Sequence, residues 1–331
     1  MTNTMQALVL TTYNTALTLT EIPRPRPAKG EVLVRIHASG VNPLDCKIIS
    51  GQATHAQTQL PAVPGIDLAG VVEEVGADVS RFKVGDEVYG MTGGIAGIQG
   101  SLAQYAAVDA DLLAIKPRNI SMREAAALPL IFITAWEGLV DRAQVSQGKK
   151  VLVHGGAGGV GHMAIQLARA YGAEVFATGK TGQQETITAL GATAIDYNST
   201  TVEQYVAQHS NGAGFDIVYD TLGGATLDAS FQAARTYLGH VISCLGWGTH
   251  ALAPLSFRAA TYSGVFTLLP LLSGRGRAHH GEIMRAATQL IEDGKIRVLV
   301  DPQRYTLDTV AAAHQALSQR TAQGKVVVEI V

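Results

Sequence analysis

Residues 151–180, VLVHGGAGGVGHMAIQLARAYGAEVFATGK, decide the fold of this chain. The apolar run at residues 151–153 is typical of a strand buried in a parallel sheet. Three glycines follow it at G-x-G-x-x-G spacing, and the residues after them predict a helix and then a second strand at 174–178. A glycine turn between a buried strand and a helix, followed by another strand, is typical of a dinucleotide-binding site.

Each of the three glycines, Gly156, Gly158 and Gly161, has its own physical role. The first allows a tight turn, the second lets the backbone approach a pyrophosphate, and the third lets the helix pack against the sheet. Gly159 and Val160 lie in the first turn of the predicted helix, where free N–H groups and the positive end of the helix dipole favour a phosphate. We therefore predict that these five residues bind the cofactor. The apolar face of the helix, at three-and-four spacing, is Val160, Met163, Ala164, Leu167, Ala168 and Tyr171.

The end of the second strand indicates which dinucleotide binds. A site selective for NAD usually has an acidic residue there for the ribose 2′-hydroxyl, whereas a 2′-phosphate needs a cation and small hydrogen-bond donors. Here the strand runs into Thr178, Gly179 and Lys180, and no acidic residue follows before Glu185. The sequence therefore favours NADPH over NADH, and the alternative for Lys180 is a solvated surface lysine.

The composition limits the class of protein. With 331 residues, of which 47% are hydrophobic, the chain is long enough for two domains with large cores. A formal charge of −2 gives no electrostatic reason to expect nucleic acid or an anionic membrane as a partner. The N-terminus lacks the regions of a signal peptide, and no apolar run reaches the ~18 residues of a membrane helix. Cys46 and Cys244 have no metal-type spacing, so we expect two reduced thiols in a cytoplasmic protein.

Two parts of the sequence with different patterns of expected strands and helices predict two domains. The first part consists of closely spaced strands and turns, which predicts a partly closed β-barrel. Its expected strands are residues 6–10, 16–21, 31–38, 66–76 and 82–90. From Ser121, whose capping-box pattern with Glu124 predicts a helix, helices alternate with strands in the doubly wound manner. A second helix is expected at residues 133–140, and further strands are expected at 194–197, 215–220 and 240–245. We predict a catalytic domain at residues 1–122 and 258–331, ending in a strand at 324–330, and a dinucleotide-binding domain at 123–257.

The whole chain resembles the medium-chain dehydrogenase/reductase superfamily, whose members join a GroES-like barrel domain to a Rossmann domain. The matching motifs occur in the expected order: ASGVNPLD at 38–45, VPGIDLAG at 63–70, VGDEV at 84–88, GSLAQY at 100–105, LPL at 128–130, TAW at 134–136, the glycine turn, and GKVVV at 324–328. The resemblance implies an α/β fold, with a doubly wound parallel Rossmann sheet beside a GroES-like β-barrel catalytic domain.

The zinc-dependent alcohol dehydrogenases of this superfamily have a cysteine at the position of Asn42 and a Gly-His-Glu triplet at the position of residues 65–67. Here that triplet is Gly-Ile-Asp, and the four cysteines of a structural zinc site are absent as well. A catalytic zinc needs three protein ligands, so the resemblance implies a metal-free branch and we expect no metal site. His162 lies just inside the predicted helix, where we expect it to be exposed to solvent.

Among the metal-free branches, the chain looks most like the quinone oxidoreductases and, within them, the enone or alkenal reductases. Quinone oxidoreductases related to zeta-crystallin tend to carry tyrosine at the position of Lys47 and near Ala53, whereas the enone reductases tend to carry lysine at the first. The resemblance places Asn42 and Lys47 as catalytic residues in the cleft beside the nicotinamide. The role of Lys47 stays open between hydrogen bonding to the ribose, stabilising an oxyanion and relaying a proton. Asp45 and Asp67 are expected to hold loops.

The resemblance also implies cofactor contacts outside the glycine turn. Tyr197 would reach the 2′-phosphate together with Lys180, and Lys325 would approach the cofactor from the C-terminal strand. The residues expected at the nicotinamide or at the wall of its pocket are Thr134, Leu245, Gly246 and Phe266.

The predicted activity is a zinc-independent transfer of hydride from NADPH to a quinone or to the C=C bond of an α,β-unsaturated carbonyl. Hydride addition to such an acceptor gives an enolate or phenolate, which needs less stabilisation than an alkoxide. Two alternatives stay open: a crystallin-like or RNA-binding protein that binds NADPH with little turnover, and a zinc alcohol dehydrogenase. Members of the family usually pair the edge strands of their Rossmann sheets, so we expect a homodimer.

Overall fold

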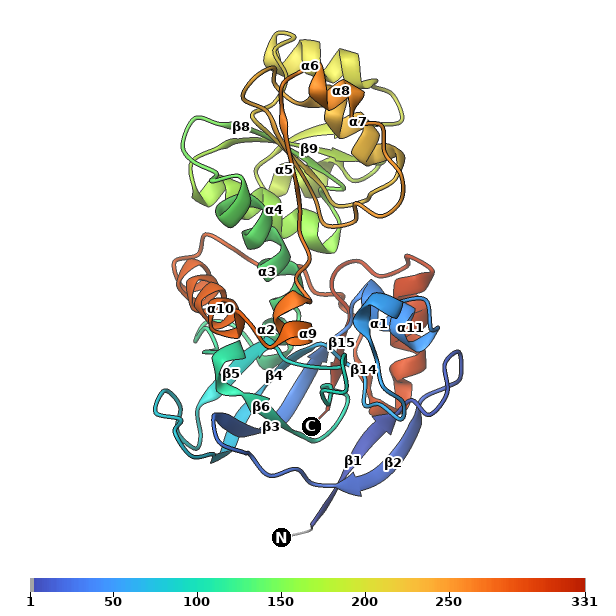
Figure 1. Cartoon of the computed structure of the whole chain (residues 1–331), viewed down its shortest axis with the longest axis vertical. Coiled ribbons are helices and arrows are strands. Elements are labelled where there is room, and N and C mark those ends of the chain that lie inside the picture. Colours follow the sequence, from blue (N-terminus) through green and yellow to red (C-terminus); the bar gives the residue numbers. More distant parts are fainter. Residues whose placement is uncertain (1–2, 331) are drawn as a thin grey trace. The chain divides into compact units, whose positions relative to one another are not determined.

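The computed structural model describes residues 3–330 and divides the chain into two compact units. The first unit is Met1–Leu130 with Leu268–Val331, and the second is Ile131–Thr267. Figure 1 shows both units and labels their helices and many of their strands. Among the described residues, no helix is long and apolar enough to cross a membrane.

The second unit is built on a parallel sheet of six strands in the order β10-β9-β8-β11-β12-β13. Its strands are β8 (Lys150–His154), β9 (Glu174–Gly179), β10 (Thr193–Asp196), β11 (Ile217–Asp220), β12 (His240–Ser243) and β13 (Thr261–Gly264). Numbered along the chain within this unit, the order is 3-2-1-4-5-6, which is that of a dinucleotide-binding doubly wound sheet. The predicted α/β fold is confirmed. The order reverses between β8 and β11, where such folds bind their ligand.

Helices connect these parallel strands. They are α4 (Gly159–Ala170), α5 (Gln184–Ala189), α6 (Val202–Ser210), α7 (Ala225–Ala233) and α8 (Ala253–Ser256). The chain enters the unit through α3 (Pro129–Trp136), which continues into the π-helix η3 (Glu137–Arg142). Helix α4 is buried along almost its whole length, since every residue from Gly161 to Ala168 is buried. The expected exposure of His162 is therefore wrong: it is 2% exposed, and its ring Nδ1 lies 3.0 Å from the carbonyl oxygen of Gly158.

Strand β13 was not predicted from the sequence. It pairs in parallel with β12, and the amides of Thr261 and Val265 donate to the carbonyl oxygens of Gly239 and Ser243 at either end of it. These bonds make the strand the sixth of the sheet, so the second unit extends to Thr267 rather than ending at residue 257.

The first unit contains a two-stranded sheet and a seven-stranded sheet. Strands β1 (Thr4–Val9) and β2 (Thr18–Pro23) form the small sheet; the large one contains β3 (Glu31–Gly40), β4 (Asp67–Val75), β5 (Glu87–Met91), β6 (Tyr105–Asp109), β7 (Leu113–Ile115), β14 (Tyr305–Thr306) and β15 (Val327–Glu329). β3 is its centre: β4 pairs with almost its whole length, β6 pairs with its first half and β15 with its end. Two register shifts between β3 and β4 bend the strand, as bulges do in barrels.

Helices and short 3₁₀ turns complete the first unit. They are α1 (Pro43–Ile49), α2 (Met122–Ala126), α9 (Leu269–Ser273), α10 (Arg277–Glu292), α11 (Val310–Ser318), η1 (Thr54–Ala56), η2 (Ala110–Leu112) and η4 (Leu307–Thr309). The capping box predicted before α2 is confirmed, because the Ser121 amide donates to Glu124 Oε2 at 2.8 Å and Ser121 Oγ accepts from the Glu124 amide at 3.2 Å.

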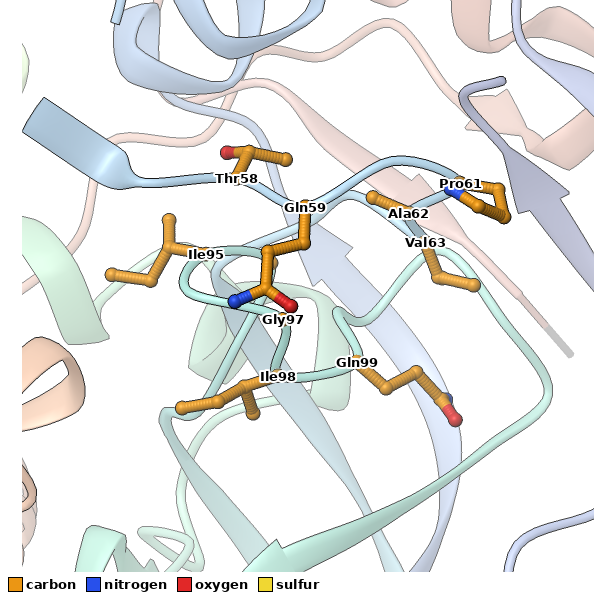
Figure 2. A pocket seen from close by; sticks show the side chains of 10 residues that line it. Thr58, Gln59, Pro61, Ala62, Val63, Ile95, Gly97, Ile98 and Gln99 are labelled. Atoms are coloured by element: carbon orange, nitrogen blue, oxygen red, sulfur yellow. The ribbon is translucent and has the colours of Figure 1, made fainter. Parts of the chain in front are cut away.

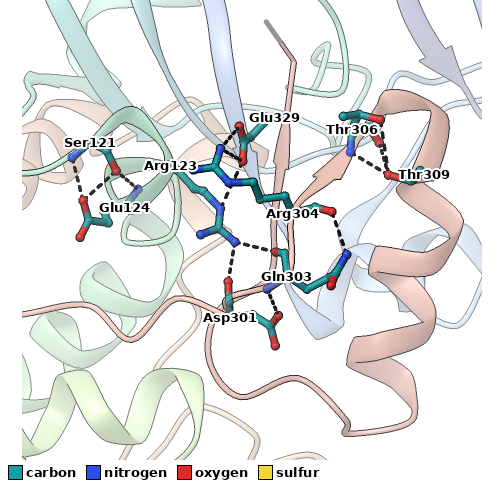
Figure 3. Close-up of polar contacts among 9 residues, drawn as sticks. All are labelled: Ser121, Arg123, Glu124, Asp301, Gln303, Arg304, Thr306, Thr309 and Glu329. Atoms are coloured by element: carbon teal, nitrogen blue, oxygen red, sulfur yellow. Dashed lines mark hydrogen bonds and ion pairs between the residues drawn. The ribbon is translucent and has the colours of Figure 1, made fainter.

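Helix α2 is held in the first unit by Arg123, as Figure 3 shows. The Arg123 guanidinium donates to the carbonyl oxygens of Asp301 and Gln303 and lies 3.5 Å from Glu329 of β15. Arg304 completes the network with a bond of 2.9 Å to the same glutamate. These contacts explain why the first unit continues to Leu130, beyond the predicted boundary at residue 122.

Candidate functional site

The glycine turn follows strand β8 directly. Gly155 has a φ of +73°, so the left-handed turn falls on this residue, one before the first glycine of the motif. The amide of Gly156 donates to the carbonyl oxygen of Thr178 at 2.9 Å. A Cβ on Gly156 would lie 2.7 Å from the Cβ of Ala177. Gly156 is thus required by close packing against β9, and the tight turn is made by Gly155.

The other two glycines of the motif differ in the space around them. A Cβ on Gly161 would overlap the carbonyl oxygen of Gly155 and lie 2.8 Å from its carbonyl carbon, so α4 can approach the turn only without a side chain there. Gly158, the N-cap of α4, is exposed, and a Cβ on it would meet only the same oxygen, at 3.1 Å. The N-cap residue, a glycine, supplies no side-chain cap at this end of α4. Its first N–H groups, beside an exposed glycine, fit a pyrophosphate.

The Thr178 side chain holds the glycine turn in place. Its Oγ1 lies 3.0 Å from Nδ1 of His154 and accepts from the amide of Gly155 at 3.3 Å, and its side chain is buried. Burial lowers the pKa of His154 to about 4, partly opposed by the charge of Asp220, so the ring is neutral near pH 7. In the structure the Thr178 hydroxyl is therefore bonded within the glycine turn, to the backbone amide of Gly155.

Lys180 and Tyr197 lie next to each other at the ends of neighbouring strands. Strands β9 and β10 pair Gly179 with Asp196, which makes Lys180 and Tyr197 the next residues in register. Both side chains are exposed, and the Tyr197 amide donates to the Gly179 carbonyl oxygen at 3.3 Å. The structure thus brings together a cation and a phenol that the sequence predicts at a 2′-phosphate.

Residues predicted at the nicotinamide gather in the second unit. Thr134 is buried, with its Oγ1 3.0 Å from that of Thr267, and its carbonyl oxygen accepts from the Tyr219 hydroxyl at 2.5 Å. A Cβ on Gly246 would overlap the Tyr262 hydroxyl, so that tyrosine side chain would have to shift to admit one. Its neighbour Leu245 is held through its amide, which donates to Ser243 Oγ at 3.1 Å, and Phe266 packs edge-to-face on Trp247 with ring centroids 6.1 Å apart.

Asp220, which was not predicted as a site residue from the sequence, orders the loop after β11 at the point where the strand order reverses. Its carboxylate is fully buried and accepts from the amides of Leu222 and Gly223 and from Ser243 Oγ at 2.7 Å. Next to it, Thr221 Oγ1 donates to the His154 carbonyl oxygen at 2.7 Å. The signal in the sequence was an acidic residue at the carboxyl end of a predicted central strand.

In the first unit, Asn42 is the centre of a buried polar cluster. It is 0% exposed; its Nδ2 donates to Asp67 Oδ2 at 2.9 Å, and its Oδ1 accepts from Lys325 Nζ at 2.5 Å. Lys325 Nζ also donates to the carbonyl oxygen of Val41 at 2.8 Å. Lys325, which was predicted to approach the cofactor, thus donates a hydrogen bond to Asn42. Both ends of the Asn42 amide are engaged, one by an anion and one by a cation.

Two carboxyl groups of this cluster have raised pKa values. Burial raises the pKa of Asp45 to about 7, and the charge of Asp67 adds to the effect. Burial also raises the pKa of Asp67 to about 6, opposed by the charge of Lys325 and by hydrogen bonds from Asn42 and Leu130. Asp45 Oδ2 accepts from the Asn42 amide at 2.7 Å and so caps α1. Both acids thus bind backbone at the start of a helix: Asp45 accepts from the Asn42 amide before α1, and Asp67 accepts from the Leu130 amide in the first turn of α3.

Lys47 lies two residues after Asp45 on α1, and its side chain is exposed. Burial lowers the pKa of His55, and the charge of Lys47 adds to this effect, so the two side chains are near each other. Lys47 thus belongs to the solvent-facing side of α1, whereas Asp45 belongs to its buried side.

Two loops of the first unit enclose a cavity of about 160 Å³. Its walls are formed by residues 58–63 and 94–99, and Figure 2 shows the Gln59 side chain reaching across it toward Gly97. Ile95, Ile98 and Val63 supply apolar surface, and Gln59 supplies an amide.

Within residues 3–330, no group of three or more His, Cys, Asp or Glu side chains is placed to hold a metal ion. Both cysteines are free thiols, and burial raises the pKa of Cys46 to about 11 and that of Cys244 to about 12.

Comparison with known proteins agrees with this geometry. Residues 28–118 match the family model of the alcohol dehydrogenase GroES-like domain, and residues 190–328 match that of a zinc-binding dehydrogenase. The chain is 38% identical over 312 residues to the 2-methylene-furan-3-one reductase of Solanum lycopersicum, covering 92% of this chain and 73% of that protein. Identity and coverage are the same for the chloroplastic NADPH-dependent alkenal/one oxidoreductase of Arabidopsis thaliana.

Further relatives agree on the family. The quinone oxidoreductase of Sus scrofa is 30% identical over 313 residues, which cover 93% of this chain and 91% of that one. Among solved structures, an alcohol dehydrogenase superfamily protein from Novosphingobium aromaticivorans is 54% identical with a TM-score of 0.97, over 99% of this chain and 100% of that one. The chain therefore belongs to the medium-chain dehydrogenase/reductase superfamily, among the relatives of its quinone oxidoreductases and alkenal/one reductases.

Proposed function

We propose that this protein is a zinc-independent, NADPH-dependent reductase of conjugated carbonyl compounds, acting on the C=C bond of α,β-unsaturated carbonyls and on quinones. The observation that carries the proposal is the arrangement at Asn42. Zinc-dependent relatives have a cysteine ligand at this position, whereas here the amide bridges Asp67 and Lys325. An amide that is bonded at both ends in this way leaves no ligand for zinc at this position. A site without a metal favours conjugated acceptors, because the enolate or phenolate that hydride addition forms needs less stabilisation than an alkoxide.

The second unit supplies the groups that would hold the cofactor. The first N–H groups of α4, next to Gly158, would bind the pyrophosphate, and Lys180 and Tyr197 would bind the 2′-phosphate. When bound, NADPH supplies the hydride. The neutral His154 and the Thr178 hydroxyl hold the turn in shape without a charge beneath the phosphates.

The preference for NADPH follows from the same groups. Lys180 is exposed at the end of β9, where it can form a charge-assisted bond to a 2′-phosphate. The Arabidopsis relative is named as an NADPH-dependent oxidoreductase, which supports the same choice.

The first unit supplies the groups that would face the acceptor. Lys47 is an exposed cation on α1, where it would stabilise the charge that develops on the acceptor oxygen or relay a proton to it. The apolar loops at residues 58–63 and 94–99 would contact the carbon skeleton of the acceptor. Asn42 would hold the N-terminus of α1 in position.

We further propose a homodimer formed through the edge strand β13. This strand ends the sheet, and large apolar side chains near it are exposed: Tyr237 at 79%, Leu238 at 68% and Phe257 at 87%. Unpaired strand edges beside apolar surface favour association with another chain. Solution scattering should give the mass of a dimer, and Phe257→Glu should shift it toward a monomer; a monomeric mass for the unaltered protein would refute the proposal.

An acceptor panel tests the function. Purified protein is offered a short enone, a flat quinone and a saturated aldehyde with NADPH, with NADH as the cofactor control and with a zinc chelator in a parallel series. We expect turnover of the enone, overlapping turnover of the quinone, a preference for NADPH and no effect of the chelator. Turnover of the saturated aldehyde alone, or loss of activity with the chelator and its return with zinc, would show that the protein is a zinc alcohol dehydrogenase.

A further inference from the structure

Three ionisable side chains of the first unit are buried together without balanced charge. Asp45, Asp67 and Lys325 are 2%, 0% and 6% exposed. With all three ionised, the cluster would carry a net charge of −1 away from solvent, which is costly because charges lose their hydration on burial. A single proton on one of the two carboxyls removes this imbalance and leaves one cation with one anion.

The hydrogen bonds tell the two carboxyls apart. Asp67 uses both oxygens as acceptors, Oδ1 from the Leu130 amide and Oδ2 from Asn42 Nδ2, each at 2.9 Å. This pattern suits a carboxylate, because a carboxylate accepts at both oxygens. Asp45 accepts only at Oδ2, and its Oδ1 is buried without a hydrogen-bond partner among residues 3–330. A proton on Oδ1 would avoid burying an unpaired anionic oxygen.

The surrounding groups leave this balance unchanged near neutral pH. Burial lowers the pKa of Lys325, which precedes β15, and the charge of Asp67 opposes this by favouring the protonated form. Cys46 on α1 is a neutral thiol, because burial raises its pKa to about 11. His314, on the helix α11 that packs against α1, is neutral because burial lowers its pKa to about 4.

We propose that Asp45 is held as a neutral carboxylic acid and Asp67 as a carboxylate, and that the resulting charge balance locks Asn42 and the first turn of α1 in position. Asn42 links the two charged groups: its Oδ1 accepts from the ammonium of Lys325, and its Nδ2 donates to Asp67. Rotating the amide by 180° would place its NH₂ group against the ammonium and its oxygen against the carboxylate, so the amide is fixed in one orientation. Asp45 holds the Asn42 backbone from the other side. The three side chains are thus positioning residues for α1, the helix that presents Lys47.

The protonation pattern is tested without reference to activity. Infrared spectra of protein with isotope-labelled aspartate carboxyls, recorded at pH 7, where Asp67 with its pKa of about 6 is mostly ionised, should show the C=O band of a buried protonated carboxyl. The band should disappear in Asp45→Asn. In Asp67→Asn it should also weaken, because Asp45 then becomes the counter-ion of Lys325 and gives up its proton. Absence of the band from the unaltered protein, or its persistence in Asp45→Asn, would overturn the proposal.

The positioning role rests on the proposed function, so its test uses the enone assay. In the unaltered protein kcat should fall as the pH rises through about 7, by up to tenfold per pH unit, because Asp45 then ionises beside Asp67. The Asp45→Asn variant should lack this decline, whereas Asp67→Asn should have a lower kcat at every pH. An alkaline decline that persists unchanged in Asp45→Asn would refute the role. Failure of every acceptor in the unaltered protein would count against the proposed function instead, and the infrared result would stand apart from it.

Discussion

Replacement of Gly158 by alanine should separate cofactor binding from stability. Gly158 has φ −78° and ψ 174°, a conformation open to alanine, and the added Cβ would meet only the Gly155 carbonyl oxygen, at 3.1 Å. Alanine is a poorer N-cap than glycine, but it restricts the unfolded chain by about 0.4–1 kcal/mol. The free energy of unfolding should therefore change by less than about 1 kcal/mol.

The effect on NADPH should be much larger. The methyl group would project from an exposed position beside the first N–H groups of α4, where the pyrophosphate would lie. Loss of one hydrogen bond to a charged group costs about 1.5–3 kcal/mol, which corresponds to a roughly 10- to 150-fold weaker Kd. Calorimetric titration with NADPH measures this change, and urea unfolding of the apo-protein measures stability.

Gly161→Ala is the matched comparison. Its Cβ would overlap the Gly155 carbonyl oxygen, so α4 must shift, and both the affinity and the stability should fall, the latter by about 1–3 kcal/mol. If Gly158→Ala bound NADPH as tightly as the unaltered protein, the placement of the pyrophosphate at this turn would be refuted.

Three further predictions follow from the same geometry. Lys180→Glu should lower the preference for NADPH over NADH at least tenfold, because a charge-assisted bond is replaced by repulsion, and kcat/KM with each cofactor measures it. The pKa of Asp45 is raised from 3.8 to about 7, so the native state binds the extra proton and stability should fall by about 4 kcal/mol as the pH rises through that window. Urea midpoints between these pH values should therefore fall less in Asp45→Asn than in the unaltered protein, and the fall that remains in the variant comes from Asp67, whose pKa burial raises to about 6. Tyr219→Phe should lower the free energy of unfolding by about 0.5–1.5 kcal/mol, because the buried hydrogen bond from its hydroxyl to the Thr134 carbonyl oxygen is lost, whereas an unchanged urea midpoint would contradict that bond.

The structural features that the sequence predicts correctly are those with a local physical cause. The apolar run before the glycine turn and the Ser121 capping box both predict structures that depend on their own neighbours, and both are confirmed. The doubly wound fold follows in the same way from alternating strands and helices. The glycine roles were only partly predicted, since the left-handed turn falls on Gly155 rather than Gly156.

Features set by distant contacts were missed. Strand β13 is four residues, Thr261–Gly264, and only its pairing with β12 makes it a strand. His162 is buried because α4 is covered on nearly all sides, which an amphipathic pattern does not reveal. The cluster around Asn42 joins residues hundreds of positions apart in the chain, so the hydrogen bond between Lys325 and Asn42 was not predicted.

The central claim, hydride transfer to a conjugated carbon, is tested most directly by following the hydride itself. NADPH deuterated at the transferable position of C4 is incubated with the protein and a short enone, and the product is examined by mass spectrometry and NMR. The account predicts a saturated ketone with deuterium on the β-carbon. Deuterium on the carbonyl carbon of an allylic alcohol would contradict it.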